Sequence, residues 1–133
     1  MFFSSTYEHS LDDKGRVAIP ARYRHLFADG GFLVQGNDGC LEVYAASEFE
    51  RMAQRVSGES PTSPHGRRLR RGFFARAWDI GLDRQGRILV PAALREWAGL
   101  NGPVVLAGRL ECLEIWSPER WAVELEQLDG NGE

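Results

Sequence analysis

The chain has 133 residues, of which 43% are hydrophobic and 26% charged, a composition typical of one compact globular unit or of two half-size lobes that share a core. Its apolar runs are far shorter than the roughly 20 residues of a membrane-spanning helix, and the N-terminal Met-Phe-Phe lacks the flanks of a secretory signal, so we expect a cytoplasmic protein. The net charge of −3 hides an uneven distribution along the chain. Residues 51–76 carry seven arginines and one acid, whereas residues 111–133 carry seven acids and one arginine. We therefore expect electrostatic fields of opposite sign on different surfaces of one protein, or on complementary faces of two subunits.

The first elements expected along the chain are a short strand into a loop at Asp12 and a strand out of it at 17–19. Pro20 fits the first turn of a short helix, where its missing N–H costs nothing. Apolar runs at 32–35 and 41–44 flank a Gly-Asn-Asp-Gly turn and predict a β-hairpin. A second helix follows, with apolar residues at a spacing near 3.6: Phe49, Met52, Ala53 and Val56.

The middle of the chain is polar and then basic. Prolines, glycines and serines within 57–66 predict a solvent-exposed loop. A basic helix is expected next, with an apolar stripe at Leu69, Phe73 and Ala77 and with arginines facing elsewhere. We expect this helix to be solvated or to contact another subunit.

From residue 82 the sequence repeats itself, because residues 82–95 reproduce residues 11–24 in order and spacing at an offset of 71. The segment Cys-Leu-Glu-Val-Tyr at 40–44 likewise returns as Cys-Leu-Glu-Ile-Trp at 112–116. Such agreement indicates an internal duplication. The second copy therefore predicts a strand at 88–90, a helix from Pro91 that Gly99 stops, a hairpin of 104–107 with 113–116 around a Gly108-Arg109 turn, and a helix that starts at Ser117-Pro118 and is apolar at Trp121, Leu125 and Leu128.

We divide the chain into a first repeat at 5–50, a linker loop and basic helix at 51–76, a second repeat at 77–123 and an acidic C-terminal end at 124–133. Each repeat alone has exposed strand edges and too little core to be stable. Interleaving the strands of the two halves would give a small closed barrel and remove the edges. We therefore expect an α+β fold, mainly β, with short helices packed outside a barrel.

Each copy carries an Asp-x-x-x-Arg loop, at 12–16 and at 83–87. Gly15 and Gly86 permit a tight turn with positive φ, across which aspartate and arginine can meet. In a structural interpretation, Asp12 and Asp83 brace the turn through an ion pair or backbone hydrogen bonds. In a functional interpretation the aspartates keep this role, and Arg16 and Arg87 bind DNA.

Arginine chemistry favours the functional interpretation, since a guanidinium on a rigid turn can engage guanine or two phosphate oxygens bidentately. Lys14 and Arg84, at or next to the loop tips, would add phosphate contacts. Lys14 is the only lysine among sixteen cationic residues, and the rigid fork of arginine suits phosphate or guanine. A GC-rich coding bias explains this preference equally well.

Taken together, these motifs resemble the MraZ family, which is built from two SpoVT/AbrB-type repeats. The resemblance covers nearly the whole chain: Met-Phe-Phe, the Asp-x-Lys-Gly-Arg loop with Val-Ala-Ile-Pro-Ala-Arg-Tyr-Arg, the Arg-Arg-Gly-Phe-Phe-Ala segment and the second Asp-x-x-Gly-Arg loop. It implies a swapped-hairpin, double-psi-like β-barrel formed by the two repeats and a ring-shaped homo-oligomer, such as an octamer. It also implies a nucleoid-associated regulator, typically a repressor of the bacterial division and cell-wall gene cluster, that binds promoter repeats.

By matching positions, the resemblance assigns residues of both copies to double-stranded DNA: Lys14, Arg16, Arg22, Arg84 and Arg87. The second copy departs from the first, with Gln85 in place of Lys14 and Ala93 in place of Arg22. We therefore expect the second loop to contribute fewer phosphate contacts.

An enzyme is not expected, because the sequence has no nucleophile elbow, zinc-protease motif, phosphate loop or cysteine-histidine cluster. We likewise expect no cofactor, metal or small-molecule substrate. Cys40 and Cys112 lie far apart in apolar contexts and predict two buried thiols. The remaining alternative is a ring-forming interaction protein whose basic helix and acidic end pair between neighbours, with little direct DNA binding.

Overall fold

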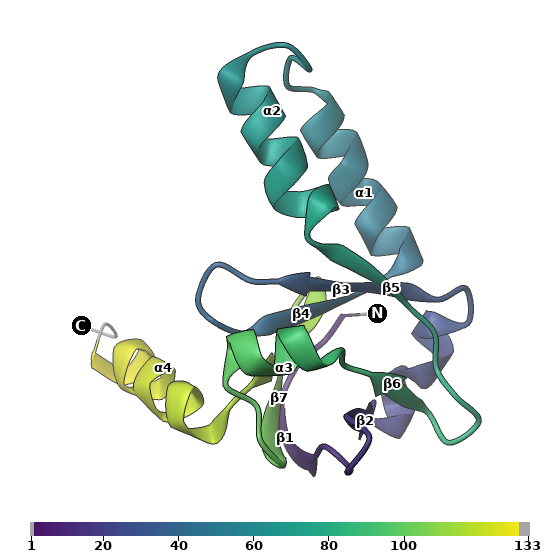
Figure 1. The fold of residues 1–133 in the computed structure, drawn as a ribbon, viewed down its shortest axis with the longest axis vertical. Helices are drawn as coiled ribbons and strands as arrows, with labels where there is room; N and C mark the ends of the chain where they lie inside the picture. The colour runs from purple at the N-terminus through teal and green to yellow at the C-terminus, as the bar shows by residue number, and fades with distance from the viewer. Residues whose placement is uncertain (1, 131–133) are drawn as a thin grey trace.

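The computed structural model describes residues 2–130, whose strands form an antiparallel six-stranded sheet and a separate two-stranded ribbon (Figure 1). The sheet has the order β1 (Thr6–Ser10), β7 (Pro103–Arg109), β8 (Cys112–Trp116), β4 (Leu41–Ala45), β3 (Gly31–Gln35) and β5 (Ala77–Ile80). The ribbon pairs β2 (Arg16–Ala18) with β6 (Arg87–Leu89). The fold is mixed α and β and mainly strands, as the sequence predicts.

Strand pairing joins the two repeats into one unit. Both predicted hairpins form, as β3–β4 and as β7–β8, and the pair β4–β8 holds them side by side. The first strand of each copy pairs with the hairpin of the other copy, β1 with β7 and β5 with β3. Neither repeat therefore completes its sheet from its own strands.

The closed barrel expected from the sequence is not seen, because within residues 2–130 the sheet stays open at β1 and β5. The strands β2 and β6 have three residues each, and they pair with each other instead of bridging the sheet edges. The main core fills the space between ribbon and sheet. Val17 and Ile88 from the ribbon are fully buried in the same apolar cluster as Leu33, Leu106 and Ile115 from the sheet.

The helices extend from this centre in several directions. They are η1 (Ala21–Phe27), α1 (Ala46–Ser57), α2 (Pro64–Arg70), η2 (Arg71–Ala75), α3 (Ala92–Ala98) and α4 (Pro118–Gly130). The α1–α2 hairpin projects away from the sheet, on the side opposite the ribbon, while α4 leaves in another direction (Figure 1). No helix within residues 2–130 has the length and apolar character needed to cross a membrane.

Aromatic side chains fix the helical hairpin to the sheet. The ring of Phe49 in α1 stacks on that of Phe32 in β3, with centroids 4.1 Å apart. Phe73 in η2 packs against Phe49 and Tyr44, with centroids 5.8 and 6.1 Å away. The outer part of the hairpin extends away from the sheet (Figure 1).

Two predicted elements are wrong in position. The helical stripe of Leu69, Phe73 and Ala77 breaks, since a π-helical turn follows α2 and Ala77 begins β5, where it pairs with Val34. The predicted Gly108-Arg109 turn lies inside β7, and the chain reverses at Leu110, whose φ is 62°. A bridge between Phe3 and Leu110 continues the pairing of β1 with β7 beyond the end of both strands.

The prediction for the cysteines is confirmed. Cys40 and Cys112 are free and buried. Burial raises the pKa of the Cys112 thiol to about 12, so this group stays protonated and inert at neutral pH.

Candidate nucleic-acid interface

The first loop is closed by one carboxylate. Asp12 Oδ1 accepts hydrogen bonds from the backbone N–H groups of Lys14 and Arg16, each at 2.9 Å. Asp12 Oδ2 accepts a third from Arg16 Nε, also at 2.9 Å. Gly15, with φ of 81°, supplies the left-handed residue that such a tight turn requires. The backbone and the Arg16 side chain are thus held by the same aspartate.

The second loop repeats this geometry residue by residue. Asp83 Oδ1 accepts from the backbone N–H groups of Gln85 and Arg87, and its Oδ2 accepts from Arg87 Nε, all at 2.9 Å. A longer contact of 3.4 Å runs from Arg87 Nη1 to Asp12 Oδ2 and joins the loops. The two copies therefore form one pseudo-symmetric pair.

Both loop aspartates are held ionised. The hydrogen bond from the Arg16 N–H is the main cause that lowers the pKa of Asp12 from 3.8 to about 2, and the Arg87 N–H likewise lowers the pKa of Asp83. A carboxylate with a lowered native pKa favours folding at pH values above its unfolded pKa. For Asp12 this contribution is lost as the pH falls from about 4 to about 2.

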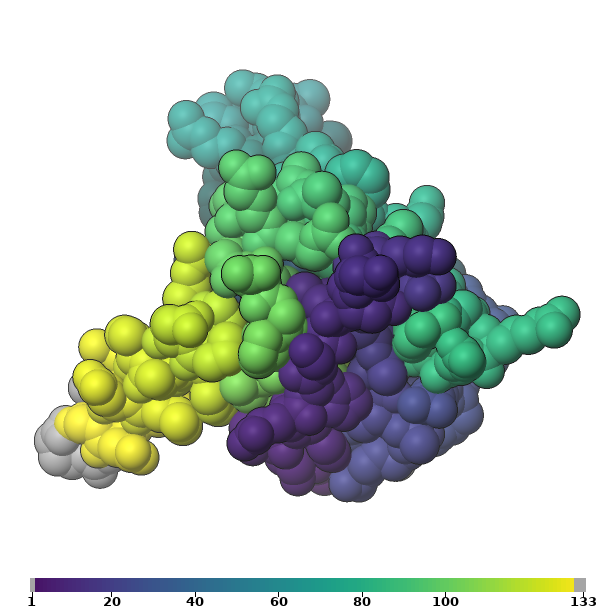
Figure 2. Space-filling model, turned by 60° about the horizontal axis from the view of Figure 1, so that its bottom comes forward, coloured from purple at the N-terminus to yellow at the C-terminus, as the bar shows by residue number. Residues whose placement is uncertain are grey.

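The ribbon turns its arginines outward. Val17 and Ile88 point into the core, so the flanking positions Arg16 and Arg87 face solvent, with side chains 31% and 27% exposed. Leu89, which pairs with Arg16 and is 57% exposed, lies on the same outer face. Figure 2 brings this end of the molecule forward and shows the purple N-terminal segment next to the green segment of the second repeat.

Two further arginines, which sequence reasoning missed, pack on the loops from the opposite repeat. Arg24 in η1 donates from Nε to the Ile19 carbonyl at 2.8 Å, and its guanidinium lies against Gly86 of the second loop. The Arg95 guanidinium from α3 lies against Gly15 of the first loop in the same way. A signal existed, because arginine closes the repeated segment in both copies, at 24 and 95.

The other assigned cations are distributed unequally. Lys14 and Arg84 are exposed near the two loop tips. Arg22 in η1 instead contacts the tyrosines: its Nη1 lies 3.5 Å from the Tyr7 hydroxyl, and its guanidinium lies 5.0 Å from the centre of the Tyr23 ring. The structure therefore groups Lys14, Arg16, Arg84 and Arg87 with the loops and places Arg22 beside β1.

We expect Gly15→Ala to reduce the free energy of unfolding by more than Gly102→Ala does. Both glycines have positive φ, 81° and 84°, so alanine introduces strain of about 1–2 kcal/mol at either site. At Gly102 a Cβ would meet no atom within 4 Å, whereas at Gly15 it would overlap the Arg95 guanidinium. Urea unfolding of both variants measures the difference, and equal losses would contradict a packed Arg95–Gly15 contact.

In residues 2–130, no group of three or more histidine, cysteine, aspartate or glutamate side chains is arranged to hold a metal ion. His9 is engaged structurally, with Nδ1 2.7 Å from the Ala18 carbonyl oxygen. The features that stand out chemically are thus the two loops and their arginines.

Known proteins are similar to this chain across both of its repeats. The family described as "MraZ protein, putative antitoxin-like" matches residues 2–72 and again residues 73–131. The chain is 44% identical over 130 residues to the transcriptional regulator MraZ of Thermomicrobium roseum, covering 98% of this chain and 92% of the relative. It is 45% identical over 129 residues to that of Roseiflexus castenholzii, covering 97% and 90%. It is 40% identical over 125 residues to that of Saccharopolyspora erythraea, covering 94% and 87%. This chain belongs to the MraZ family.

Proposed function

We propose that this chain is a transcription regulator that binds double-stranded DNA through its β2–β6 ribbon. The observation that carries the proposal is the pair Arg16 and Arg87, fixed by Asp12 and Asp83 on the outer face of the ribbon. The relatives bear the name transcriptional regulator MraZ, which agrees with this role. The family resemblance extends the proposal to repression of the division and cell-wall gene cluster by a nucleoid-associated protein.

The major groove is about 12 Å wide and admits a two-stranded β-ribbon, the architecture that β2 and β6 form. Arg16 and Arg87 would read guanine through its O6 and N7 acceptors, and the exposed Leu89 would contact a thymine methyl group. Because their aspartates already orient the arginines, little side-chain entropy is lost on binding.

The surrounding cations would position the ribbon on the DNA backbone. Lys14 and Arg84 would contact phosphates from the loop tips, and Arg24 and Arg95 would support the loops from behind. Arg22 would contact the DNA from beside β1, where its guanidinium lies against Tyr7 and Tyr23. The first copy would bind more strongly than the second, where Gln85 and Ala93 replace cations.

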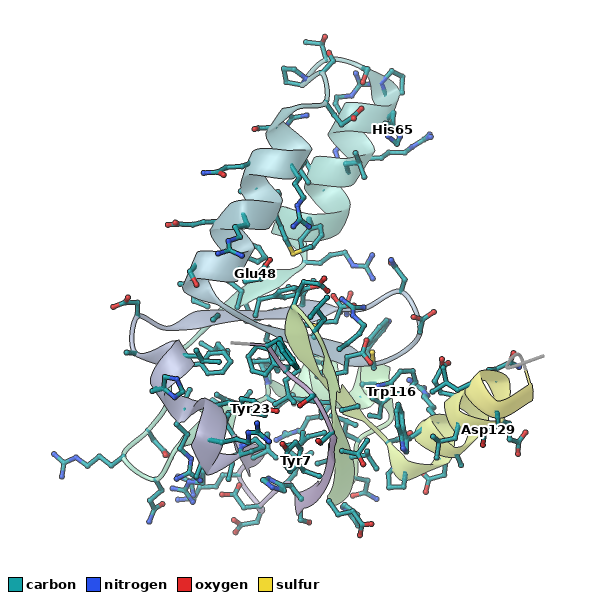
Figure 3. The ribbon with its side chains drawn as sticks, turned by 180° about the vertical axis from the view of Figure 1, so that it is seen from behind. Tyr7, Tyr23, Glu48, His65, Trp116 and Asp129 are labelled. Carbon is teal, nitrogen blue, oxygen red and sulfur yellow. The ribbon has the colours of Figure 1, made fainter. Side chains whose placement is uncertain are left out.

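Self-association into a ring is the second part of the proposal. The exposed faces of α1 and α2 are rich in arginine, whereas α4 carries acidic residues and exposed apolar side chains, among them Val123 and Leu128. In Figure 3, His65 near the hairpin tip and Asp129 near the end of α4 lie on widely separated projections. Pairing α4 with the hairpin of a neighbour would be a head-to-tail contact, the kind that can close a ring.

Charge reversal tests this contact. We expect Glu126→Lys with Asp129→Lys to reduce the mass measured by light scattering from a species larger than a dimer to monomers, because the α4 surface would repel the basic hairpin. Adding Arg51→Glu and Arg55→Glu to the same chain should restore the assembly. A monomeric wild-type chain at micromolar concentration would contradict the proposed ring, as would a mass unchanged by the first reversal.

A ring would explain how such small loops could bind specifically. One good bidentate pair supplies about 1–3 kcal/mol of base discrimination. Several loops matched to repeats one helical turn apart would act at high effective concentration, so avidity would replace a large single interface. A scaffold protein with little DNA affinity is the alternative, and the same ring would then leave DNA unprotected.

A footprint on the DNA upstream of the chain's own coding sequence tests the proposed function, because a ring bound to spaced repeats should protect regularly spaced sites.

A further inference from the structure

A cavity of about 310 Å³ lies between the β3–β4 hairpin and the segment α2–η2. Its apolar walls come from Val34, Leu69 and Phe73, and its polar groups include Glu42, Arg68 and Arg76. The segment α2–η2 that lines it belongs to the helical hairpin, which lies on the side of the sheet away from the β2–β6 ribbon (Figure 1). The proposed DNA contacts therefore do not use it.

The buried carboxylate of Glu42 lines the cavity and belongs to a hydrogen-bond network with more carboxylates than guanidinium groups. Glu42, 8% exposed, accepts hydrogen bonds from the Tyr44 hydroxyl at 2.9 Å and from Arg109 Nη1 at 3.0 Å. Glu114 pairs with Glu42 across β4 and β8 and accepts from the same Arg109 Nη1 at 3.2 Å and from Trp116 Nε1 at 2.9 Å. One guanidinium thus serves two carboxylates, which leaves an excess negative charge next to the cavity.

Positive charge lines the cavity as well. Arg76 donates from Nε to Gln35 Oε1 at 2.9 Å, whereas the Arg68 guanidinium makes no hydrogen bond or ion pair with any residue in 2–130. Between them runs the π-helical turn η2, a rare conformation that occurs frequently at functional sites. Its Gly72 lines the cavity and has open space where a Cβ would be.

We propose that this cavity binds a small zwitterion with an apolar body, of the α-amino acid class. The ammonium group contacts Glu42 and offsets the excess negative charge of the network. The carboxylate of the ligand contacts Arg68, whose donors are free, and the apolar side chain lies against Val34 and Phe73. A ligand with one charge alone satisfies only one of the two polar groups, so the site selects for both charges together.

Calorimetric titration of the full chain tests this assignment with L-leucine and L-phenylalanine as probes. The matched half-ligands for leucine are 3-methylbutylamine, which lacks the carboxylate, and 4-methylpentanoate, which lacks the ammonium group. We expect leucine to bind at least about tenfold more tightly than either half-ligand, because each lost charged hydrogen bond weakens binding by that order. Equal affinity of leucine and one half-ligand would overturn the proposal, as would the absence of saturable binding by both amino acids.

Variants locate the binding at this cavity. Arg68→Gln should weaken leucine binding about tenfold or more, and Gly72→Leu should abolish it by filling the open space. Arg71→Gln removes the same charge from an exposed neighbour that does not line the cavity, so it should leave the affinity unchanged. Glu42→Gln should also weaken binding. If that variant does not fold, the variants at Arg68 and Gly72, which are exposed positions, keep the test decisive. Equal effects of Arg68→Gln and Arg71→Gln would contradict the assignment.

Discussion

Replacing Arg16 and Arg87 together by alanine is expected to weaken binding to a promoter fragment with spaced repeats by at least about thirtyfold, because two bidentate contacts of about 1–3 kcal/mol each are lost. The fold should survive. Both arginines are part-exposed, and ion pairs at such positions contribute about 0–1 kcal/mol to stability. A gel shift measures the affinity, and light scattering checks that the oligomer persists.

Two matched variants separate specific recognition from general charge. Arg16→Lys with Arg87→Lys keeps the charge but loses the planar fork, so its affinity should lie between those of wild type and the alanine variant. Arg67→Ala with Arg71→Ala removes two charges from the helical hairpin, far from the ribbon, and should leave the gel shift nearly unchanged as long as light scattering shows that the oligomer persists (Figure 1). If the hairpin variant lost binding as strongly as the ribbon variant while its oligomer persisted, the ribbon would not be the interface.

The second large effect is expected from Arg109→Met, which should lower the free energy of unfolding at pH 7 by about 2–3 kcal/mol. The change leaves Glu42 and Glu114 facing each other across β4 and β8 without the guanidinium that they share. The figure is below that of a fully buried pair, because the Arg109 side chain is 44% exposed and partly screened by water. Adding Glu114→Gln should recover much of the loss.

The pH dependence of the Arg109→Met variant has a definite sign. Burial raises the pKa of Glu114 above its ordinary value of 4.5, so the native state binds this proton more readily than the unfolded chain. The free energy of unfolding therefore falls as the pH rises through the raised native pKa, and more steeply once Arg109 is gone. Urea unfolding at pH 5 and pH 7 measures this, and a variant as stable as wild type at both values would contradict the shared-arginine network.

The duplication and the two loops could be predicted from the sequence because they depend on local spacing. An aspartate four residues before an arginine, with glycine between, closes its own turn, and the hydrogen bonds that close the turns of Asp12 and Asp83 are local. The two hairpins have the same local origin. The packing of Arg24 and Arg95 could not be predicted, because Arg24 reaches Gly86 and Arg95 reaches Gly15, both far away in sequence.

Other features depended on which strands become neighbours. The burial of Glu42 and Glu114 is one of them, because β4 and β8 are central strands with both faces covered. Ala77 likewise continues a helical pattern, but pairing with Val34 makes it a strand residue. The open sheet in place of a barrel has the same cause, since β2 and β6 pair only with each other.

Footprinting on the DNA upstream of the chain's own coding sequence tests the central claim most directly, with wild type and the Arg16→Ala, Arg87→Ala variant side by side at moderate salt. The expected result is protection by wild type of short sites spaced about 10 base pairs, or multiples of that, apart, and no protection by the variant at the same oligomeric state. A wild-type chain that assembles but protects no site would contradict the account, and so would a variant that gives the wild-type pattern.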